Sequence, residues 1–108
     1  YLRHQMGDLV IKKLAIEIQK RLPLGSNCFR YGGDEFLILV QGSTKESIQS
    51  LVGSLLECPY RLRLEVTISI GVKHASQALG SVEQFIDNAD QALYISKKNG
   101  RNQISWSD

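Results

Sequence analysis

Two glycines followed by two acids stand near the middle of this 108-residue sequence, in the run RYGGDEF at residues 30–36. Apolar stretches flank the run, so Gly32 and Gly33 are expected to close a β-hairpin in which a positive φ angle costs little. Because glycine has no side chain, its backbone amide can approach a phosphate closely, and a neighbouring carboxylate can hold Mg²⁺ against that phosphate. The run therefore has the outline of a nucleotide site. An ordinary turn with solvated Asp34 and Glu35 explains the same spacing, and on spacing alone it is the simpler interpretation.

A second group of reactive side chains lies near the C-terminus. Asp90, Tyr94, Lys97 and Arg101 fall on one stripe of an α-helix, provided that its last turn reaches Arg101. The two cations could neutralise a triphosphate. Cations at a helix C-terminus are also favourable against the helix dipole, which explains them without a ligand. Asp8, at the start of the first expected helix, can likewise be explained as an N-terminal cap.

Hydrophobic periodicity predicts the elements that must position these residues. Apolar residues recur at helical spacing in three stretches, and Ser43–Glu46 and Ser81–Gln84 read as capping boxes before two of them. A period of two predicts a strand with one buried face, with Ser69 on the other face; Gly71 near its end indicates a bulge or a close backbone approach. The expected order is helix, hairpin, helix, strand, helix and strand, over residues 8–22, 28–40, 43–58, 61–72, 81–100 and 104–106.

Length and composition are those of one globular domain, with 43% hydrophobic and 22% charged residues. No apolar run is long enough to span a bilayer, and a net charge of +2 is too small to indicate nucleic-acid binding. We therefore expect no nucleic-acid partner and no membrane contact by this domain. Cys28 and Cys58 lack metal-ligand spacing and are expected to be free thiols in a cytoplasmic protein. Because the first residue is Tyr1, the chain is expected to be part of a longer protein.

Three motifs, in this order, resemble those of the GGDEF domains of bacterial diguanylate cyclases. They are RYGGDEF at residues 30–36, TISIGV at residues 67–72, and ADQALY at residues 89–94 followed by Lys97 and Gly100–Asn102. The similarity runs from His4 to about Ile104, so residues 1–108 are expected to form a single GGDEF-like domain. It implies an α/β (α+β) fold with a mixed, mainly antiparallel sheet flanked by helices, similar to the palm of adenylyl cyclases and polymerases. It also implies condensation of two GTP molecules into cyclic di-GMP, with release of pyrophosphate and with Mg²⁺ or Mn²⁺ as cofactor.

The resemblance assigns roles to individual residues. Asp34 matches the acid that binds the metal and is often assigned as the proton acceptor. An acid suits this position, because a ribose 3′-hydroxyl that attacks an α-phosphate must lose its proton while charge on phosphorus is compensated. His4 and Asp8 match the nucleoside end of the site, with Asp8 accepting hydrogen bonds from guanine. The full set of residues implied to bind GTP is His4, Asp8, Gly32, Gly33, Glu35, Lys97 and Arg101.

The sequence departs from the family pattern in places that matter for activity. The family's first strand carries its main metal-binding aspartate, and a guanine-binding asparagine follows; both would fall before Tyr1, so the domain is expected to be N-terminally incomplete. Taken alone, the chain is expected to lack cyclase activity and to dimerise, swap or aggregate through unpaired strand edges. Pro23–Ser26 occupy the positions of an Arg-x-x-Asp inhibitory site in many relatives, so tight product binding is not expected there. Arg3 replaces the family's usual glycine before His4.

Two functions follow as alternatives. In the first, the longer protein is a diguanylate cyclase whose catalytic domains pair as an antiparallel homodimer, because each domain holds one GTP. A fused sensory or regulatory domain would then control pairing, in the cytoplasm or as part of a membrane-anchored protein. In the second, the domain is a non-catalytic GGDEF-like module that binds GTP or a partner domain and regulates it. The intact Gly32–Phe36 run favours the enzyme.

Overall fold

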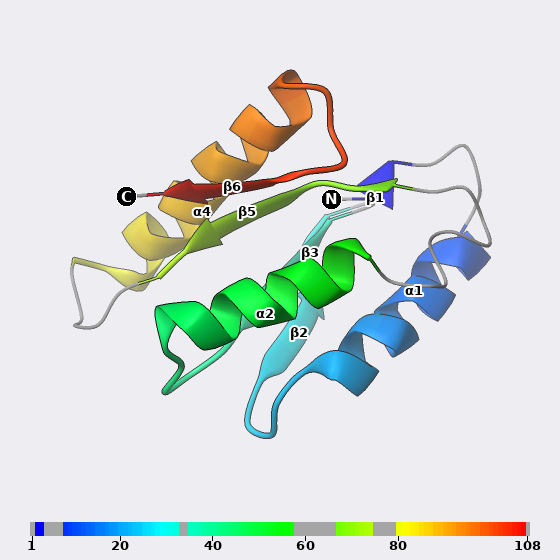
Figure 1. The fold of residues 1–108 in the computed structure, drawn as a ribbon, viewed down its shortest axis with the longest axis horizontal. Coiled ribbons are helices and arrows are strands. Elements are labelled where there is room, and N and C mark those ends of the chain that lie inside the picture. The colour runs from blue at the N-terminus through cyan, green and yellow to red at the C-terminus, as the bar shows by residue number, and fades with distance from the viewer. Residues whose placement is uncertain (1, 4–7, 33–34, 58–66, 75–79, 108) are drawn as a thin grey trace.

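The structure, a computed structural model, describes residues 2–3, 8–32, 35–57, 67–74 and 80–107. Helices and strands share these ranges, which confirms the α/β class (Figure 1). The helices are α1 (Asp8–Arg21), α2 (Lys45–Leu56) and α4 (Val82–Lys98). The strands are β1 (Leu2–Arg3), β2 (Asn27–Arg30), β3 (Phe36–Leu39), β4 (Thr67–Ile68), β5 (Ile70–Lys73) and β6 (Ile104–Ser107). None of the helices in these ranges combines the length and apolar character needed to cross a membrane.

The described strands pair in three two-stranded ladders. β2 and β3 are antiparallel, with Arg30 opposite Phe36. β1 is antiparallel to β4, whereas β5 and β6 are parallel. The pairing is therefore mixed and mainly antiparallel, as expected, but within the described residues the ladders do not join into one sheet.

The apolar core lies where α1 meets α2 and the strands. Ile11, Leu14 and Ile18 form the buried face of α1, and each is at most 5% exposed. They cluster with Leu55 of α2 and Ile68 of β4. This confirms the buried face predicted for the first helix. Figure 1 shows α2 in front of the β2–β3 hairpin and α4 behind β5 and β6, so helices lie on both sides of the strands.

α4 approaches β5 most closely at Gly71. A Cβ atom added to Gly71 would lie 2.6 Å from the Cα atom of Leu93, and it would also meet the backbone nitrogen of Leu93 and the carbonyl oxygen of Ala89. Ala92, on the same helix, is 2% exposed. A close backbone approach, one of the two explanations for this glycine, is confirmed.

The strand expected over residues 61–72 differs from the structure where it is described. Ser69 separates β4 from β5, and the two short strands pair with different partners. Ser69 is only 1% exposed, so the expectation of one buried face is wrong here. Residues two apart in a strand face the same side, so Ser69 faces the same side as Gly71. The backbone of α4 covers that side at Gly71. Residues 58–66, which include Cys58, lie outside the described ranges.

α2 begins with a cap at Thr44 rather than at Ser43. Thr44 has the extended backbone of an N-cap (φ −83°, ψ 161°), and its Oγ1 accepts a hydrogen bond from the backbone nitrogen of Ser47 at 3.1 Å. The Oγ of Ser47 donates in return to the carbonyl oxygen of Thr44 at 2.9 Å. The predicted capping box is therefore wrong by one residue. At the start of α4, the expected cap at Ser81 is confirmed by its bond to the backbone nitrogen of Gln84.

Replacing Thr44 with alanine is expected to lower the free energy of unfolding by about 1 kcal/mol, because an amide of the first turn of α2 loses its acceptor. The loss would be measured by urea denaturation followed by circular dichroism. Ser43→Ala is the matched control, and we expect it to change stability by less than about 0.5 kcal/mol. Equal losses in the two variants would contradict the assignment of Thr44 as the cap.

Candidate functional site

The hairpin loop is closed by its own backbone. The amides of Tyr31 and Gly32 both donate to the carbonyl oxygen of Glu35, at 2.7 and 3.3 Å. Together with the pairing of β2 and β3, these bonds confirm the predicted hairpin. The loop is longer than the expected two-glycine turn, because residues 31–35 all lie between the strands. Gly33 and Asp34 lie outside the described residues.

Gly32 is not required by the fold. Its φ angle is not in the left-handed region, so the expectation that this glycine relieves a positive φ is wrong. A Cβ atom at Gly32 would make ordinary contacts of 3.8 Å with Cβ and Oε1 of Glu35. The fold therefore leaves room for a side chain at this exposed position, while the amide of Gly32 is bonded to the carbonyl oxygen of Glu35.

An ion pair joins this loop to the last turn of α4. The Nζ atom of Lys97 donates to Oε2 of Glu35 at 2.8 Å, across a sequence separation of 62 residues. The two side chains are 22% and 28% exposed, so water reaches the pair only in part. Two residues that the sequence assigned to GTP are thus in direct contact. A phosphate that reaches Lys97 would compete with the Glu35 carboxylate for the same ammonium group.

Arg101 lies in a turn that follows α4. The helix ends at Lys98, so the predicted helical stripe does not extend to Arg101. Gly100, Arg101 and Asn102 have φ angles of 113°, 64° and 52°, which reverse the chain toward β6. The left-handed backbone is easy for glycine, but it costs a residue with a side chain about 1–2 kcal/mol. Lys97 and Arg101 are therefore presented by a helical turn and by the loop after it.

Two buried hydroxyl groups beside this turn were missed by the sequence analysis. Ser96 is 0% exposed, and its Oγ donates to the carbonyl oxygen of Ile70 at 2.8 Å and contacts Oγ of Ser105 at 2.7 Å. The Oγ of Ser69 accepts a hydrogen bond from the backbone nitrogen of Asn102 at 3.2 Å. One signal was present in the sequence: Ser69 and Gly71 give one side of the strand only small residues, a pattern typical of close packing.

The remaining predicted residues are only partly described. Asp8 is the first residue of α1, at the helix start that the sequence predicted. His4, like Gly33 and Asp34, lies outside the described ranges. The roles assigned to these four residues therefore remain predictions.

The described residues alone do not make a metal centre. Among them, no three His, Cys, Asp or Glu side chains come together in a group that could hold an ion. Glu35 is the described carboxylate of the motif, and it is paired with Lys97. Mg²⁺ is usually held by one or two carboxylates together with phosphate oxygens and water. The described donors do not fit such an ion without further ligands.

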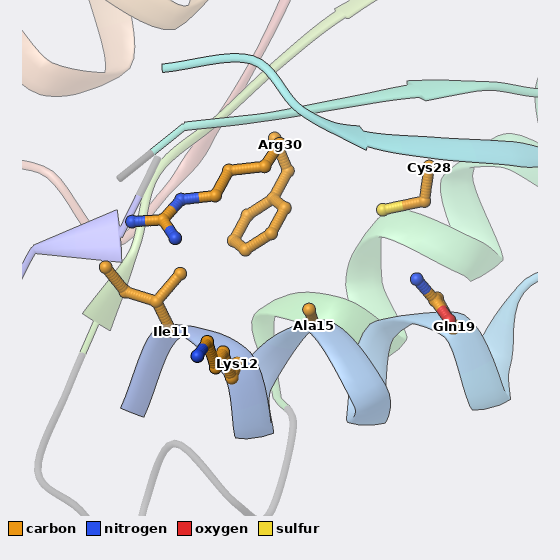
Figure 2. A pocket seen from close by; sticks show the side chains of 7 residues that line it. Ile11, Lys12, Ala15, Gln19, Cys28 and Arg30 are labelled. Carbon is orange, nitrogen blue, oxygen red and sulfur yellow. The ribbon is translucent and has the colours of Figure 1, made fainter. Parts of the chain in front are cut away.

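A pocket of about 140 Å³ lies between α1 and the hairpin, and neither Glu35 nor Lys97 lines it (Figure 2). In Figure 2, the side chain of Arg30 extends toward Ile11 at one end of the pocket, and Cys28 lies toward the other end, on the side of Gln19. Burial raises the pKa of the Cys28 thiol, so the thiol stays protonated at neutral pH and is a poor nucleophile. Cys28 is a free thiol, as expected. The lining residues are Ile11, Lys12, Ala15, Gln19, Cys28, Arg30 and Phe36.

Comparison with protein families finds one match that covers most of the sequence. The family model described as "Diguanylate cyclase, GGDEF domain" matches residues 2–103. "Probable diguanylate cyclase DgcI" of Escherichia coli K12 is 36% identical over 104 residues, which are 95% of this chain and 23% of the relative. "Diguanylate cyclase A" of Treponema denticola is 30% identical over 111 residues, covering 96% of this chain and 30% of the relative. The chain thus spans less than a third of the length of either protein.

Solved structures support the same fold. The GGDEF domain of TpbB (YfiN) from Pseudomonas aeruginosa superimposes with a TM-score of 0.78 at 24% identity, over 97% of this chain and 66% of that chain. The GGDEF domain of DgcB from Caulobacter crescentus, solved in complex with c-di-GMP, gives a TM-score of 0.68 at 24% identity, over 95% and 66% of the two chains. At these identities the likeness concerns the fold alone.

Proposed function

Because this chain belongs to the GGDEF domain family of diguanylate cyclases, we propose that it is the catalytic domain of a longer enzyme that makes cyclic di-GMP from two GTP molecules. Relatives of 36% and 30% identity are named diguanylate cyclases. The Caulobacter neighbour was solved with c-di-GMP bound. These similarities support GTP as the substrate and cyclic di-GMP as the product.

The observation that carries the proposal is the ion pair between Lys97 and Glu35 at 2.8 Å. It joins the hairpin loop of the first motif to the helix of the third, so residues far apart in sequence meet at one place. A fortuitous hairpin would have no reason to contact this lysine. Gly32 adds to the argument, since the fold leaves space for a Cβ atom there. A triphosphate that approaches the exposed loop at Gly32 would meet no side chain there, and it would have the cation of Lys97 beside it.

The proposed reaction is an in-line transfer between two bound nucleotides. The 3′-hydroxyl of one GTP attacks the α-phosphorus of the other; the new P–O bond forms, the bond to the β-phosphate oxygen breaks, and pyrophosphate leaves. A second transfer closes the ring, so two pyrophosphates are released for each cyclic di-GMP. In this proposal Asp34 accepts the hydroxyl proton, and Lys97 and Arg101 balance the charge of the leaving pyrophosphate.

Two copies of the domain are needed, because each holds one GTP. Their antiparallel pairing in a homodimer would place the hydroxyl of one nucleotide opposite the phosphate of the other. Positioning of this kind can supply roughly 7–11 kcal/mol of the barrier reduction. Pairing is therefore the natural point of control, and we propose that a sensory or regulatory domain of the longer protein exerts it in the cytoplasm.

The cofactor follows from the same family membership. We propose Mg²⁺ or Mn²⁺, with Asp34 as a ligand from this chain. Since the described donors do not suffice for an ion, other ligands must complete the site.

The direct test is to incubate the longer protein with GTP and Mg²⁺ and to separate the nucleotides by chromatography. Cyclic di-GMP with a twofold molar amount of pyrophosphate is the expected result. GTP binding without product would favour the non-catalytic regulatory module, and the absence of both binding and product would overturn the proposal.

Replacing Lys97 with methionine is expected to weaken GTP binding about tenfold or more, because a hydrogen bond from a charged donor to phosphate is lost. Calorimetric titration with GTP would measure the change. Lys98→Met is the matched control: Lys98 is the next residue of α4, is exposed, and shares the position at the helix C-terminus. If both variants lost affinity equally, a general effect of positive charge would replace the specific role of Lys97.

A further inference from the structure

We infer that Ser69 is a positioning residue for Arg101: its buried hydroxyl ties down the left-handed turn after α4 and thereby fixes where Arg101 meets the phosphates. The inference rests on the proposed function for the identity of the ligand. Ser69 is expected from the sequence on the exposed face of a strand, but in the structure it is buried at the base of this turn.

The turn through Gly100, Arg101 and Asn102 is held in a conformation that its sequence does not favour throughout. Glycine adopts a positive φ readily, and asparagine tolerates one. For Arg101, at φ 64°, the left-handed backbone is sterically unfavourable. Such a backbone persists only where its surroundings determine it. The question is therefore which contacts hold Arg101 in place.

Hydrogen bonds from four backbone amides hold the turn in place. The amides of Asn99, Gly100 and Arg101 donate to carbonyl oxygens of α4, at Ile95, Lys97 and Ser96, over 2.9, 3.4 and 2.9 Å respectively. The amide of Asn102 donates instead to Oγ of Ser69 at 3.2 Å. Of these four bonds, only the last connects the turn to the strands. It lies directly after Arg101, so it restricts the peptide that Arg101 shares with Asn102.

The anchor itself is rigid. Ser69 is 1% exposed and stands between β4 and β5, and the amide of the next residue, Ile70, donates to the carbonyl oxygen of Gln103 at 2.9 Å. The Oγ of Ser96 donates to the carbonyl oxygen of the same residue, Ile70, at 2.8 Å. A neutral hydrogen bond contributes a net free energy of the same order as the backbone cost at Arg101. Nε2 of Gln103 also bonds the turn, at the carbonyl oxygens of Asn99 and Arg101 over 2.8 and 3.1 Å, but Gln103 belongs to the same loop. Loss of the Ser69 bond therefore loosens the turn on the side that faces the strands.

The test is a double-mutant cycle for GTP binding, measured by calorimetry in the presence of Mg²⁺. Ser69→Ala is expected to weaken binding about tenfold, and Arg101→Ala by at least as much. If Ser69 acts through Arg101, the double variant binds GTP no more weakly than Arg101→Ala alone. Additive losses would overturn the inference. A second readout is the dependence of GTP affinity on ionic strength. In both single variants the affinity should decline less steeply as salt is added, because one phosphate contact is lost or misplaced.

Ser105→Ala is the matched control. It removes a hydroxyl from the neighbouring strand, beside Ser96, and leaves the amide of Asn102 bonded. We expect it to lower stability without changing the salt dependence of GTP binding. If Ser105→Ala and Ser69→Ala shift affinity and salt dependence alike, Ser69 has a structural role only and the inference fails.

If Ser69→Ala does not fold, two measurements keep the inference open to refutation. Ser69→Cys keeps the size of the side chain with a weaker acceptor, and it should show the same GTP defect in smaller degree. Hydrogen exchange on the unmodified protein should find the Asn102 amide protected, whereas exchange as fast as in an unfolded peptide would overturn the inference. Failure of the unmodified protein to bind GTP would overturn the proposed function and this inference together, whereas normal binding by a folded Ser69→Ala would overturn the inference alone.

Discussion

Replacing Gly71 with alanine is expected to lower the free energy of unfolding by about 3 kcal/mol, at the upper end of the usual cost of overpacking. The added methyl group would meet backbone atoms of α4, at Leu93 and Ala89. Backbone atoms within a helix cannot rotate away as a side chain can, so α4 would have to move off β5. For a domain of this size, such a loss lowers the melting temperature by roughly 10–20 °C. Thermal unfolding followed by circular dichroism would measure it.

Gly53→Ala provides the matched control with the opposite sign. Gly53 lies within α2, and nothing lies within 4 Å of a Cβ atom added there. Alanine should stabilise the helix by roughly 0.5–1 kcal/mol, because it loses less backbone entropy than glycine on folding. A Gly71→Ala protein as stable as the unmodified one would show that α4 does not pack on β5 as closely as described.

Replacing Asp34 with alanine is expected to abolish cyclic di-GMP synthesis by the longer protein, with a fall of at least about 100-fold. The reason is chemical: without the carboxylate, the attacking hydroxyl loses its proposed proton acceptor, and the proposed metal loses a ligand from this chain. The hairpin should persist, because its closing bonds run between the backbone atoms of Tyr31, Gly32 and Glu35. The measurement is product formation per enzyme, together with the melting temperature of each protein.

Asp87→Ala is the control for this second substitution. Asp87 is an exposed acid on α4, and its Oδ2 accepts a hydrogen bond at 3.0 Å from Nε2 of Gln91. Removing it changes the net charge by the same amount as removing Asp34, and synthesis should continue. Unchanged turnover in Asp34→Ala would refute the assignment of Asp34. Lost turnover with a strongly lowered melting temperature would instead point to unfolding as the cause.

Much of the fold could be predicted because it depends on local patterns. The period of Ile11, Leu14 and Ile18 identified the buried face of α1, and short-range chemistry identified the hairpin and the cap at Ser81. These features arise between residues close in sequence, where spacing carries the geometry. The cap of α2 was displaced by one residue because Ser43 and Thr44 can both serve as caps, and sequence alone does not decide between them.

The errors have a different origin. Ser69 was assigned to an exposed face because its neighbours alternate with apolar residues, and alternation cannot reveal that a later helix covers the second face. The helical stripe through Lys97 and Arg101 required the last turn to reach Arg101, and that condition is not met because α4 ends at Lys98. The pairing of Lys97 with Glu35 connects two motifs across most of the chain. Long-range contacts of this kind are not encoded in local spacing.

The site also shows how one contact can serve the protein before substrate arrives. Lys97 is held at 2.8 Å by Glu35, and both side chains are largely shielded from water. The carboxylate keeps a cation in place that would otherwise explore many rotamers. In the proposed function, binding of GTP would exchange one anionic partner of Lys97 for another, so the lysine would not have to be ordered anew.

The left-handed turn at Arg101 affects which substitutions at this position are favoured by selection for stability and which by selection for nucleotide binding. Glycine at position 101 would adopt φ 64° without the cost that arginine bears, so a screen that rewards thermal stability alone should favour replacing the arginine. A screen that rewards nucleotide binding should retain it. The two kinds of selection act in opposite directions on a single position. If Arg101 binds the phosphates as proposed, a version of this domain selected for stability alone is expected to lose phosphate affinity.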